Sequence, residues 1–344
     1  MIATDAWHPQ LNGVVRTLEN VVRVLEKRGH EVIILSHQWE GLKTFGAPGY
    51  PEVELVWNVW KIDNIIKEVK PDAIHVATEG PIGLATRNFC YWHKVPITSS
   101  YHTKTPEFLL KVWHIPLGIG YAFMRWLHRD SRTVLVTTKS MMEELDSWTL
   151  HSNMKVWTRG ADLDLFNPNL AGEKRYNKTM LYVGRVSVEK NLEAFFNLNG
   201  PEHFRKVVVG SGPMLEAYQQ QYPDVIFVGA KTGIELAKWF ADADVFVFPS
   251  KWDTFGVVMI EANACGTPIA GYPVTGPKDF VINGVNGWLD ENLEIAVEKA
   301  LTIDRKSCRT YVENNYSWEK CVDIFEQTLV PVTWRWQQLS KENC

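Results

Sequence analysis

The chain has 344 residues, of which 45% are hydrophobic, and a formal net charge of −4. This length is enough for two domains with buried cores, and the negative charge excludes a general electrostatic attraction to nucleic acid. No stretch of about 18 apolar residues is present, which excludes a transmembrane helix, and residues 1–5 lack the basic and apolar regions of a secretory signal. The five cysteines are scattered without metal-binding spacing, as is typical of reduced thiols in a cytoplasm.

The first half of the chain alternates short β-branched runs with helical patterns. The runs at residues 32–35, 73–76, 97–99 and 133–137 predict strands, and residues 14–27 and 62–68 predict helices between them. This alternation predicts a parallel sheet with helices on both faces. Only residues 1–2 precede the first turn, so either the start lies upstream or the edge of the sheet is clipped.

Two positions in this half are candidates for ligand contact. Gly13 lies in a strand-to-helix turn, where a glycine permits the backbone to approach a diphosphate or an acceptor closely. His102 comes just after the third predicted strand, at the edge of the sheet that binds ligands in such folds. The alternatives are that Gly13 is needed only for packing and that His102 has only a structural role.

Residues 111–132 combine aromatic and basic side chains. The cations are Lys111, Arg125, Arg129 and Arg132, and the aromatic residues are interleaved with them. This mixture on an amphipathic segment predicts an interface with an anionic membrane surface. A packed helix with a solvated basic edge would give a similar pattern.

A second alternating block follows an irregular linker at residues 159–168. Strands are predicted at residues 179–183, 206–209, 225–228, 245–248 and 269–270. The expected fold class is therefore α/β, with two doubly wound Rossmann-like domains facing across a cleft. We expect the domains to cover residues 1–165 and 166–317, with a carboxyl-terminal helix at 318–344 that crosses back to the first.

Two cations follow the first strand of the second block. Arg185 and Lys190, five residues apart, would neutralise both phosphates of a leaving nucleotide if they lie at the carboxyl end of that strand. A solvated charged loop is the alternative.

Two acidic residues separated by seven positions follow the strand at 245–248. Asp253 would lie on the loop and Glu261 on the next helix. A helix that begins near Thr254 to Gly256 directs unpaired backbone N–H groups at an anion, and Gly256 allows close approach. A phosphate between two carboxylates that bind hydroxyl groups indicates a nucleotide-sugar site.

Two Asp-x-Asp sequences have the spacing that binds a divalent metal with a diphosphate in other sugar transferases. Asp162 and Asp164 lie in the linker, whereas Asp242 and Asp244 open a buried strand. Neither context suits a metal ion, so we expect no metal site and no cofactor other than the nucleotide-sugar substrate.

Three groups of residues, taken in order, resemble the retaining glycosyltransferases of family 4, which have the GT-B fold. They are Asn12-Gly13-Val14-Val15-Arg16, then Gly184-Arg185 with Glu189-Lys190-Asn191, and then Phe248-Pro249-Ser250, Asp253-Thr254-Phe255-Gly256, Glu261-Ala262 and Gly266-Thr267-Pro268. The sequences at 4–9, 78–83 and 272–277 are similar to a bacterial branch near mannosyltransferases and enzymes that glycosylate diacylglycerol.

The resemblance implies a role for each matching position. Arg185 and Lys190 would bind the donor diphosphate, Glu261 the ribose hydroxyls and Asp253 a hydroxyl of the donor sugar. The backbone from Thr254 to Val257, around Phe255 and Gly256, would support the phosphate. Gly13 would approach the diphosphate from the first domain, and His102 would line the reaction centre. Many relatives have Glu in place of Asp253, and the shorter side chain would alter the sugar preference.

The predicted function is metal-independent, retaining transfer of a hexose from a nucleotide sugar, with UDP-sugar favoured, to a membrane lipid hydroxyl such as that of diacylglycerol. The alternatives are a GDP-mannose-dependent α-mannosyltransferase acting on a phosphoinositide or glycan, and a non-catalytic nucleotide-sugar-binding protein. The expected location is the cytoplasm, peripherally on the inner face of the plasma membrane, with a nucleotide sugar and a lipid acceptor as partners and no nucleic acid.

Overall fold

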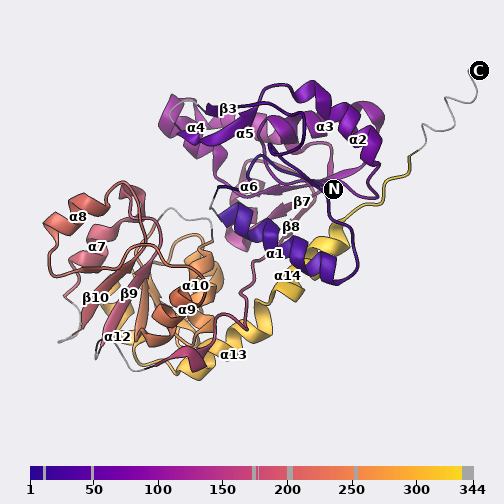
Figure 1. The fold of residues 1–344 in the computed structure, drawn as a ribbon. Coiled ribbons are helices and arrows are strands. Elements are labelled where there is room, and N and C mark those ends of the chain that lie inside the picture. The colour runs from indigo at the N-terminus through magenta and orange to yellow at the C-terminus, as the bar shows by residue number, and fades with distance from the viewer. Residues whose placement is uncertain are drawn as a thin grey trace, which may run out of the picture. The chain divides into compact units, whose positions relative to one another are not determined.

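The chain divides into two compact units, of which the first contains residues 1–157 together with the stretch from Val322, and the second contains Thr158–Cys321. The computed structural model describes residues 1–10, 13–47, 50–172, 176, 178–199, 204–251 and 255–334 (Figure 1), without the side chains of 47, 50–53, 108 and 111–113. The carboxyl-terminal part of the predicted helix at 318–344, from residue 335, lies outside these ranges. The predicted domain limits at residues 165 and 318 stay predictions.

The first unit contains a parallel six-stranded sheet with the order β2-β1-β5-β6-β7-β8. Its strands are β1 (Ile2–Ala3), β2 (Ile34–Leu35), β5 (His75–Val76), β6 (Ile97–Tyr101), β7 (Ser131–Val136) and β8 (Met154–Val156). Ile2 pairs with Ile34 on one side and with His75 on the other. The two-residue first strand therefore lies inside the sheet and not at its edge.

Helices cover this sheet as the alternation predicts. They are α1 (Gly13–Lys27), α2 (Ile62–Val69), α3 (Pro81–His93), α4 (Thr105–Trp113), α5 (Leu117–His128) and α6 (Lys139–Ser147). In α1 the buried residues Leu18, Val21 and Leu25 recur at intervals of three and four, which places one apolar stripe against the sheet. An antiparallel hairpin of β3 (Thr44–Ala47) and β4 (Tyr50–Val56) and the 3₁₀ turn η1 (Val59–Lys61) were not predicted.

The carboxyl-terminal helix α14 (Trp318–Thr328) carries the chain from the second unit back to the first. Arg28, just beyond α1, forms ion pairs with Asp323 at 2.7 Å and Glu326 at 2.6 Å. Phe325 lies in the core of the first unit, with its ring centroid 5.2 Å from that of Trp157. The return segment is therefore attached by both charge and apolar packing.

The second unit also contains a parallel six-stranded sheet, with the order β11-β10-β9-β12-β13-β14. Its strands are β9 (Thr179–Val183), β10 (Arg205–Val209), β11 (Ile226–Phe227), β12 (Val245–Phe248), β13 (Ile269–Gly271) and β14 (Gly287–Leu289). Its helices are α7 (Leu192–Phe196), α8 (Leu215–Gln221), α9 (Gly233–Asp242), α10 (Val257–Ala264), α11 (Pro277–Phe280), α12 (Leu293–Ala300) and α13 (Arg305–Asn315), with 3₁₀ turns η2 (Pro168–Leu170) and η3 (Val188–Lys190).

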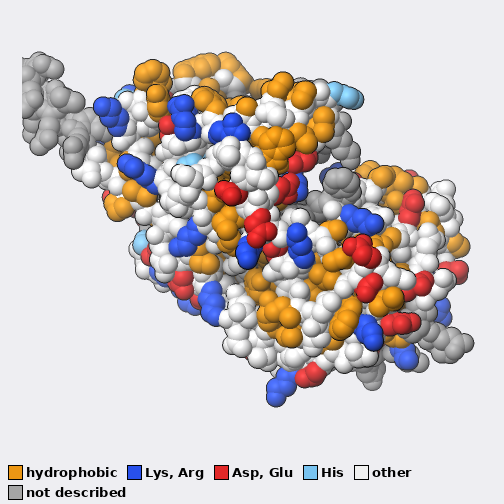
Figure 2. Space-filling model, turned by 180° about the vertical axis from the view of Figure 1, so that it is seen from behind, with side chains coloured by type: hydrophobic (Ala, Val, Ile, Leu, Met, Phe, Trp, Pro, Cys, Tyr) orange, Lys and Arg blue, Asp and Glu red, His pale blue; other side chains and the backbone are white. Residues whose placement is uncertain are grey.

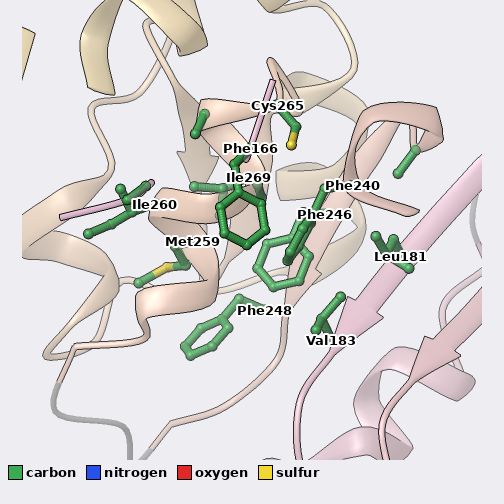
Figure 3. Close-up of a cluster of buried hydrophobic side chains, with 14 of the residues drawn as sticks. Phe166, Leu181, Val183, Phe240, Phe246, Phe248, Met259, Ile260, Cys265 and Ile269 are labelled. Atoms are coloured by element: carbon green, nitrogen blue, oxygen red, sulfur yellow. The ribbon is translucent and has the colours of Figure 1, made fainter. Parts of the chain in front are cut away.

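Both faces of this sheet are buried, which explains why its strands read as continuous apolar runs. On β12, Phe246 and Phe248 pack into one core cluster, whereas Val245 and Val247 pack into the other. Figure 3 shows the first cluster, where Phe246 and Phe248 lie with Phe240 of α9 and Met259 of α10. The expected α/β class with two Rossmann-like domains is confirmed.

Two arginines of α13 complete the second unit by capping other helices. Arg305 donates hydrogen bonds to the carbonyls of Ala241 and Ala243, at the end of α9, and of Cys265, after α10. Arg309 donates to the carbonyl of Ala264 at 2.9 Å and to that of Phe166 at 2.6 Å. A cation at a helix carboxyl terminus satisfies carbonyls that have no partner within the helix and interacts favourably with the helix dipole.

We therefore expect Arg305→Ala to reduce the stability of the second unit by about 2–4 kcal/mol, because several buried carbonyls lose a charged donor. The control is Lys306→Ala, whose exposed side chain should contribute within about 0.5 kcal/mol. Calorimetry measures the loss, and hydrogen exchange in α9 and α10 locates it. Equal melting of the two variants would contradict the capping role.

Candidate functional site

The site in the second unit begins at the point where the strand order reverses. From β9 the chain proceeds to β10 and β11 on one side, and it returns to β12, β13 and β14 on the other. The loops that follow β9 and β12 thus leave the carboxyl ends of adjacent strands in opposite directions. A crevice for ligands is expected between these loops. The side-chain amide of Asn191, after η3, donates to the carbonyl of Pro249, after β12, at 3.0 Å. This hydrogen bond holds the two loops together.

The loop that carries Arg185 packs closely against the loop after β10. A Cβ on Gly210 would lie 1.9 Å from the carbonyl oxygen of Gly184, and one on Gly212 would lie 2.3 Å from that of Val186. The Val186 amide donates to the carbonyl of Ser211 at 2.8 Å. Glycine is therefore required at Gly210 and Gly212, because any side chain would separate the loops.

The predicted cations lie on this anchored loop. The hydroxyl of Tyr182 donates to the carbonyl of Arg185 at 2.9 Å, while the Arg185 residue itself is exposed. Lys190 ends η3 and is half-buried. A loop held by its backbone, with a charged side chain exposed, can present that charge to an anion without a change in its backbone.

The β12–α10 connection carries the other predicted residues. Phe255 is buried against Phe280 and Tyr316, so only its backbone is available to a ligand. Gly256 has φ 84° and a Cβ there would lie 2.9 Å from the Phe248 ring, which excludes larger residues. Val257 begins α10, whose first turn presents backbone amides without intrahelical partners.

Glu261 lies on the same helix, 2% exposed. The candidate donor residues therefore follow two adjacent strands, β9 and β12, of one sheet. They are Arg185, Lys190, the backbone of Phe255–Val257, and Glu261. Asp253 and Thr254, predicted for the same loop, lie outside the described residues. Their roles stay predictions.

His102 and Gly13 belong to the first unit. His102 follows β6 directly, is 8% exposed, and has its ring centroid 5.7 Å from that of Trp157. Gly13 is exposed at the start of α1, and a Cβ there would meet nothing within 4 Å. In this structure Gly13 is thus not required by packing, and the roles predicted for both residues remain predictions.

Two acidic residues near the first sheet were given no role from the sequence. Asp5 follows β1 and Glu79 follows β5, so both lie at the carboxyl edge. Burial first, and then the charge of Asp5, raise the pKa of Glu79 to about 8. In the sequence, the only indication of a role for Asp5 and Glu79 is that each follows a predicted strand. That β1 and β5 are adjacent is shown only by the strand order.

The Asp-x-Asp carboxylates hydrogen-bond to the backbone. Asp162 accepts from the amides of Asp164 and Leu165, at 3.2 and 3.1 Å. Asp244 accepts from the Thr179 amide at 2.8 Å, and Asp242 from the Gly172 amide at 3.1 Å. Within the described ranges, no group of three or more His, Cys, Asp or Glu residues is arranged to hold a metal ion.

The sequence matches two family models and several curated proteins. Residues 11–165 match the model for Glycosyltransferase Family 4, and residues 177–303 that for Glycosyl transferases group 1. A GDP-mannose-dependent alpha-mannosyltransferase of Corynebacterium glutamicum is 27% identical over 336 residues, covering 89% of this chain and 81% of its own. The sulfoquinovosyl transferase SQD2 of Arabidopsis thaliana is 27% identical over 95% of this chain and 72% of its own. An alpha-monoglucosyldiacylglycerol synthase of Streptococcus pneumoniae is 25% identical over 78% and 70%, respectively.

Solved structures share the fold at lower identity. The Anabaena protein Alr3699/HepE, in complex with UDP, superposes with a TM-score of 0.72 at 17% identity, covering 95% of this chain and 97% of that one. The sucrose-phosphate synthase of Thermosynechococcus elongatus gives a TM-score of 0.72 at 19% identity, covering 96% and 94%. With two Rossmann-like units, a strand-order reversal at β9 and β12, and these matches along the chain, the protein belongs to the family 4 glycosyltransferases of the GT-B fold.

Proposed function

We propose that this glycosyltransferase moves a hexose from a UDP-sugar to a hydroxyl group of a membrane lipid such as diacylglycerol, with retention of the anomeric configuration and without a metal ion. The observation that carries the lipid acceptor is an exposed aromatic and basic surface on the first unit. The anchored cations at the β9 edge support the donor part of the proposal.

The donor chemistry follows from charge. Arg185 and Lys190 would neutralise the departing diphosphate, and the first amides of α10 would donate to a phosphate oxygen. Glu261 would accept hydrogen bonds from the ribose hydroxyls. The acceptor hydroxyl would attack from the face that the phosphate leaves, with the leaving phosphate taking its proton. Catalysis would then depend mainly on stabilising the charge of the leaving group.

The aromatic surface extends over adjoining elements of the first unit. Trp57 and Trp60, on β4's end and η1, have ring centroids 5.4 Å apart, and Trp60 is 62% exposed. Tyr91 and Trp92 of α3 have centroids 5.5 Å apart, and Trp92 is 78% exposed. Trp126 of α5 is also exposed. Helix α3 contacts both β4 and η1, so these rings lie on neighbouring elements.

Cations accompany these rings. The Lys43 Nζ lies 5.9 Å from the Trp57 ring centroid. The Arg87 guanidinium lies 4.4 Å from that of Trp126, but it is buried and ion-paired with Asp130, so it supports the ring from beneath rather than adding exposed charge. Figure 2 shows hydrophobic side chains interspersed with Lys and Arg along the top of the view, at the height where Figure 1 draws α2, α3 and α4. Trp and Tyr beside Lys and Arg are the composition that partitions to a bilayer interface.

The predicted membrane segment at 111–132 contains the end of α4, the whole of α5 and the first two residues of β7. Tyr121 is buried and stacks on Trp148 with centroids 4.3 Å apart. Arg125 donates to the carbonyls of Trp148 and Thr149, at 2.7 and 3.1 Å, and so serves the end of α6. Arg129 is exposed and lies 3.5 Å from Asp130 in an ion pair, Arg132 is exposed on β7, and the side chain of Lys111 lies outside the described residues.

None of the helices in the described ranges is long and apolar enough to cross a bilayer. Under the proposal the protein binds the inner face of the plasma membrane from the cytoplasm, through the aromatic surface and Arg129 and Arg132. The relatives named for diacylglycerol glucosylation and sulfoquinovosyl transfer support a lipid acceptor. The second candidate is α-mannosyl transfer from GDP-mannose to a phosphoinositide or glycan, because several relatives are named GDP-mannose-dependent mannosyltransferases.

The first test removes the cations. Arg185→Ala and Lys190→Ala should each lower kcat/KM by about 2–4 kcal/mol of transition-state stabilisation, with little change in melting temperature. Arg205→Ala is the matched control, because Arg205 is exposed at the opposite, amino end of β10. Steady-state kinetics measure the effect. Wild-type turnover in both folded variants would contradict the assigned roles.

The second test identifies the substrates. UDP-, GDP- and ADP-sugars are compared by thermal shift, where a specific donor at about 100 times its Kd should stabilise the fold by about 2.7 kcal/mol. The stabilising donor is then assayed with diacylglycerol, a phosphoinositide and a glycan in detergent micelles.

Transfer from a UDP-sugar to diacylglycerol, unchanged in excess chelator, is the expected result. Preference for GDP-mannose selects the second candidate, and binding without transfer to any acceptor selects a non-catalytic binding protein. Complete loss of transfer on chelation, restored by one equivalent of metal, would refute the metal-independent mechanism.

The third test concerns the membrane. Arg129→Gln with Arg132→Gln should weaken binding to vesicles containing phosphatidylglycerol by about 2 kcal/mol at low salt, because each cation near the surface contributes about 1 kcal/mol. Trp60→Ala with Trp92→Ala should weaken it at low and high salt alike. Arg125 is left unchanged because it caps α6.

Ile234→Ala and Ile295→Ala are the controls, since both are exposed apolar residues of the second unit. Cosedimentation measures binding, and donor binding should be unaffected throughout. Equal sedimentation of all variants, or no binding by the wild type, would leave a soluble acceptor as the better proposal.

A further inference from the structure

The first sheet has a strand-order reversal of its own. From β1 the chain proceeds to β2 on one side, and it returns to β5, β6, β7 and β8 on the other. The residues just after β1 and β5 therefore lie where a parallel sheet opens a crevice at its carboxyl edge. Asp5 and Glu79 occupy these positions, and His102 follows the next strand, β6.

Asp5 is committed to holding the backbone. Its carboxylate accepts hydrogen bonds from the Thr78 hydroxyl and the Ile82 amide, both at 2.8 Å, and from the Gly83 amide at 3.3 Å. A Cβ on Gly80 would lie 2.4 Å from its carboxyl carbon. Asp5 thus caps the amino terminus of α3 and fixes the loop that carries Glu79.

Glu79 lies on the same loop, and its carboxyl group has a backbone hydrogen bond to its own residue. The residue is half-buried, and its Oε1 is buried without a hydrogen-bond partner in the described part of the chain. A buried polar atom with no partner costs free energy that a ligand can recover by supplying one. The Oε1 atom of Glu79, at the edge of the sheet where ligands are expected, is therefore open to a hydrogen bond from a ligand.

Burial, then the charge of Asp5, raise the pKa of Glu79 to about 8, so its neutral form dominates at pH 7. A neutral carboxyl group can donate one hydrogen bond and accept others, which matches a hydroxyl group. An anionic ligand group is disfavoured here because Asp5 lies beside it.

We propose that the Glu79 carboxyl group binds a neutral hydroxyl of the glycosyl acceptor and so positions the acceptor on the first unit. This rests on the proposed transfer to a hydroxyl compound. Glu79 is thereby an acceptor-positioning residue, distinct from the residues that bind the donor on the second unit.

The test compares Glu79→Ala and Glu79→Gln with Glu26→Gln, an exposed carboxyl of α1. Initial rates are measured at saturating UDP-glucose with diacylglycerol varied in mixed micelles. Glu79→Ala should raise the acceptor KM about tenfold and leave the donor KM unchanged, because one hydrogen bond to the acceptor is lost. Glu79→Gln, which keeps a neutral hydrogen-bonding group, should raise the acceptor KM by about threefold or less.

A pH profile supplies a second readout. Two titratable groups near the adjacent strands interact with Glu79, namely Asp5 and Tyr101, the last residue of β6. Burial raises the pKa of Asp5, although its hydrogen bonds act in the opposite direction. Burial also raises the pKa of Tyr101, which therefore stays protonated across the pH range of the profile. Because the neutral form of Glu79 is lost as the pH rises through about 8, the wild-type acceptor KM should increase between pH 7 and 9. In Glu79→Gln this increase should be absent.

The outcomes separate the two proposals. A wild-type enzyme that turns over diacylglycerol, with an acceptor KM unchanged in both Glu79 variants, overturns the role of Glu79 alone. A wild-type enzyme that transfers to none of the hydroxyl acceptors overturns the proposed function and this inference with it. If Glu79→Ala does not fold, a pH profile identical in wild type and Glu79→Gln still refutes the proposal.

Discussion

The organisation of the second unit depends on the pairing of β9 with strands on both sides. Its backbone bonds to β10 and to β12, so the loops that follow these strands emerge side by side while the chain continues in opposite directions. The apolar faces above and below the sheet hold this arrangement rigid. Every candidate donor residue described in this unit lies on a loop or helix that leaves this point. The placement of these candidate residues is therefore a consequence of strand order.

Close backbone packing converts that topology into a defined surface. Gly210 and Gly212 let the loop after β10 touch the loop of Arg185, and Asn191 ties the latter to Pro249. Glycine loses more conformational entropy on folding than other residues, and the contacts between the two loops offset this loss. An anion that binds Arg185 therefore requires no change in the loop backbone, which favours electrostatic stabilisation.

The first unit uses the same topology with different side chains. At its strand reversal lie carboxyl groups rather than cations, and its outer helices and hairpin expose aromatic rings. Oxygen-rich groups suit hydroxyl compounds, and exposed rings beside lysine and arginine suit a lipid surface. The two sheets thus differ in the class of ligand that their edges favour, which is consistent with a donor on one unit and an acceptor on the other.

The sequence by itself determined the class of fold and indicated most of the candidate donor residues, whose roles stay predictions. The strands at 179–183 and 245–248 were predicted with their observed bounds, because a strand buried on both faces is a continuous apolar run that depends only on local composition. Arg185 and Lys190 follow β9 and Glu261 lies on α10, as the sequence pattern predicts. Tertiary structure alone decided that the two-residue β1 lies inside its sheet, since strand order is set by long-range pairing. It also assigned Tyr121 to the core and Arg125 to the end of α6, because a basic aromatic helix has the same local pattern whether its partner is protein or lipid.

The environment of Glu79 could not be predicted from the sequence for the same reason. Its raised pKa depends in part on Asp5, 74 positions earlier, and only the pairing of β1 with β5 brings the two residues together.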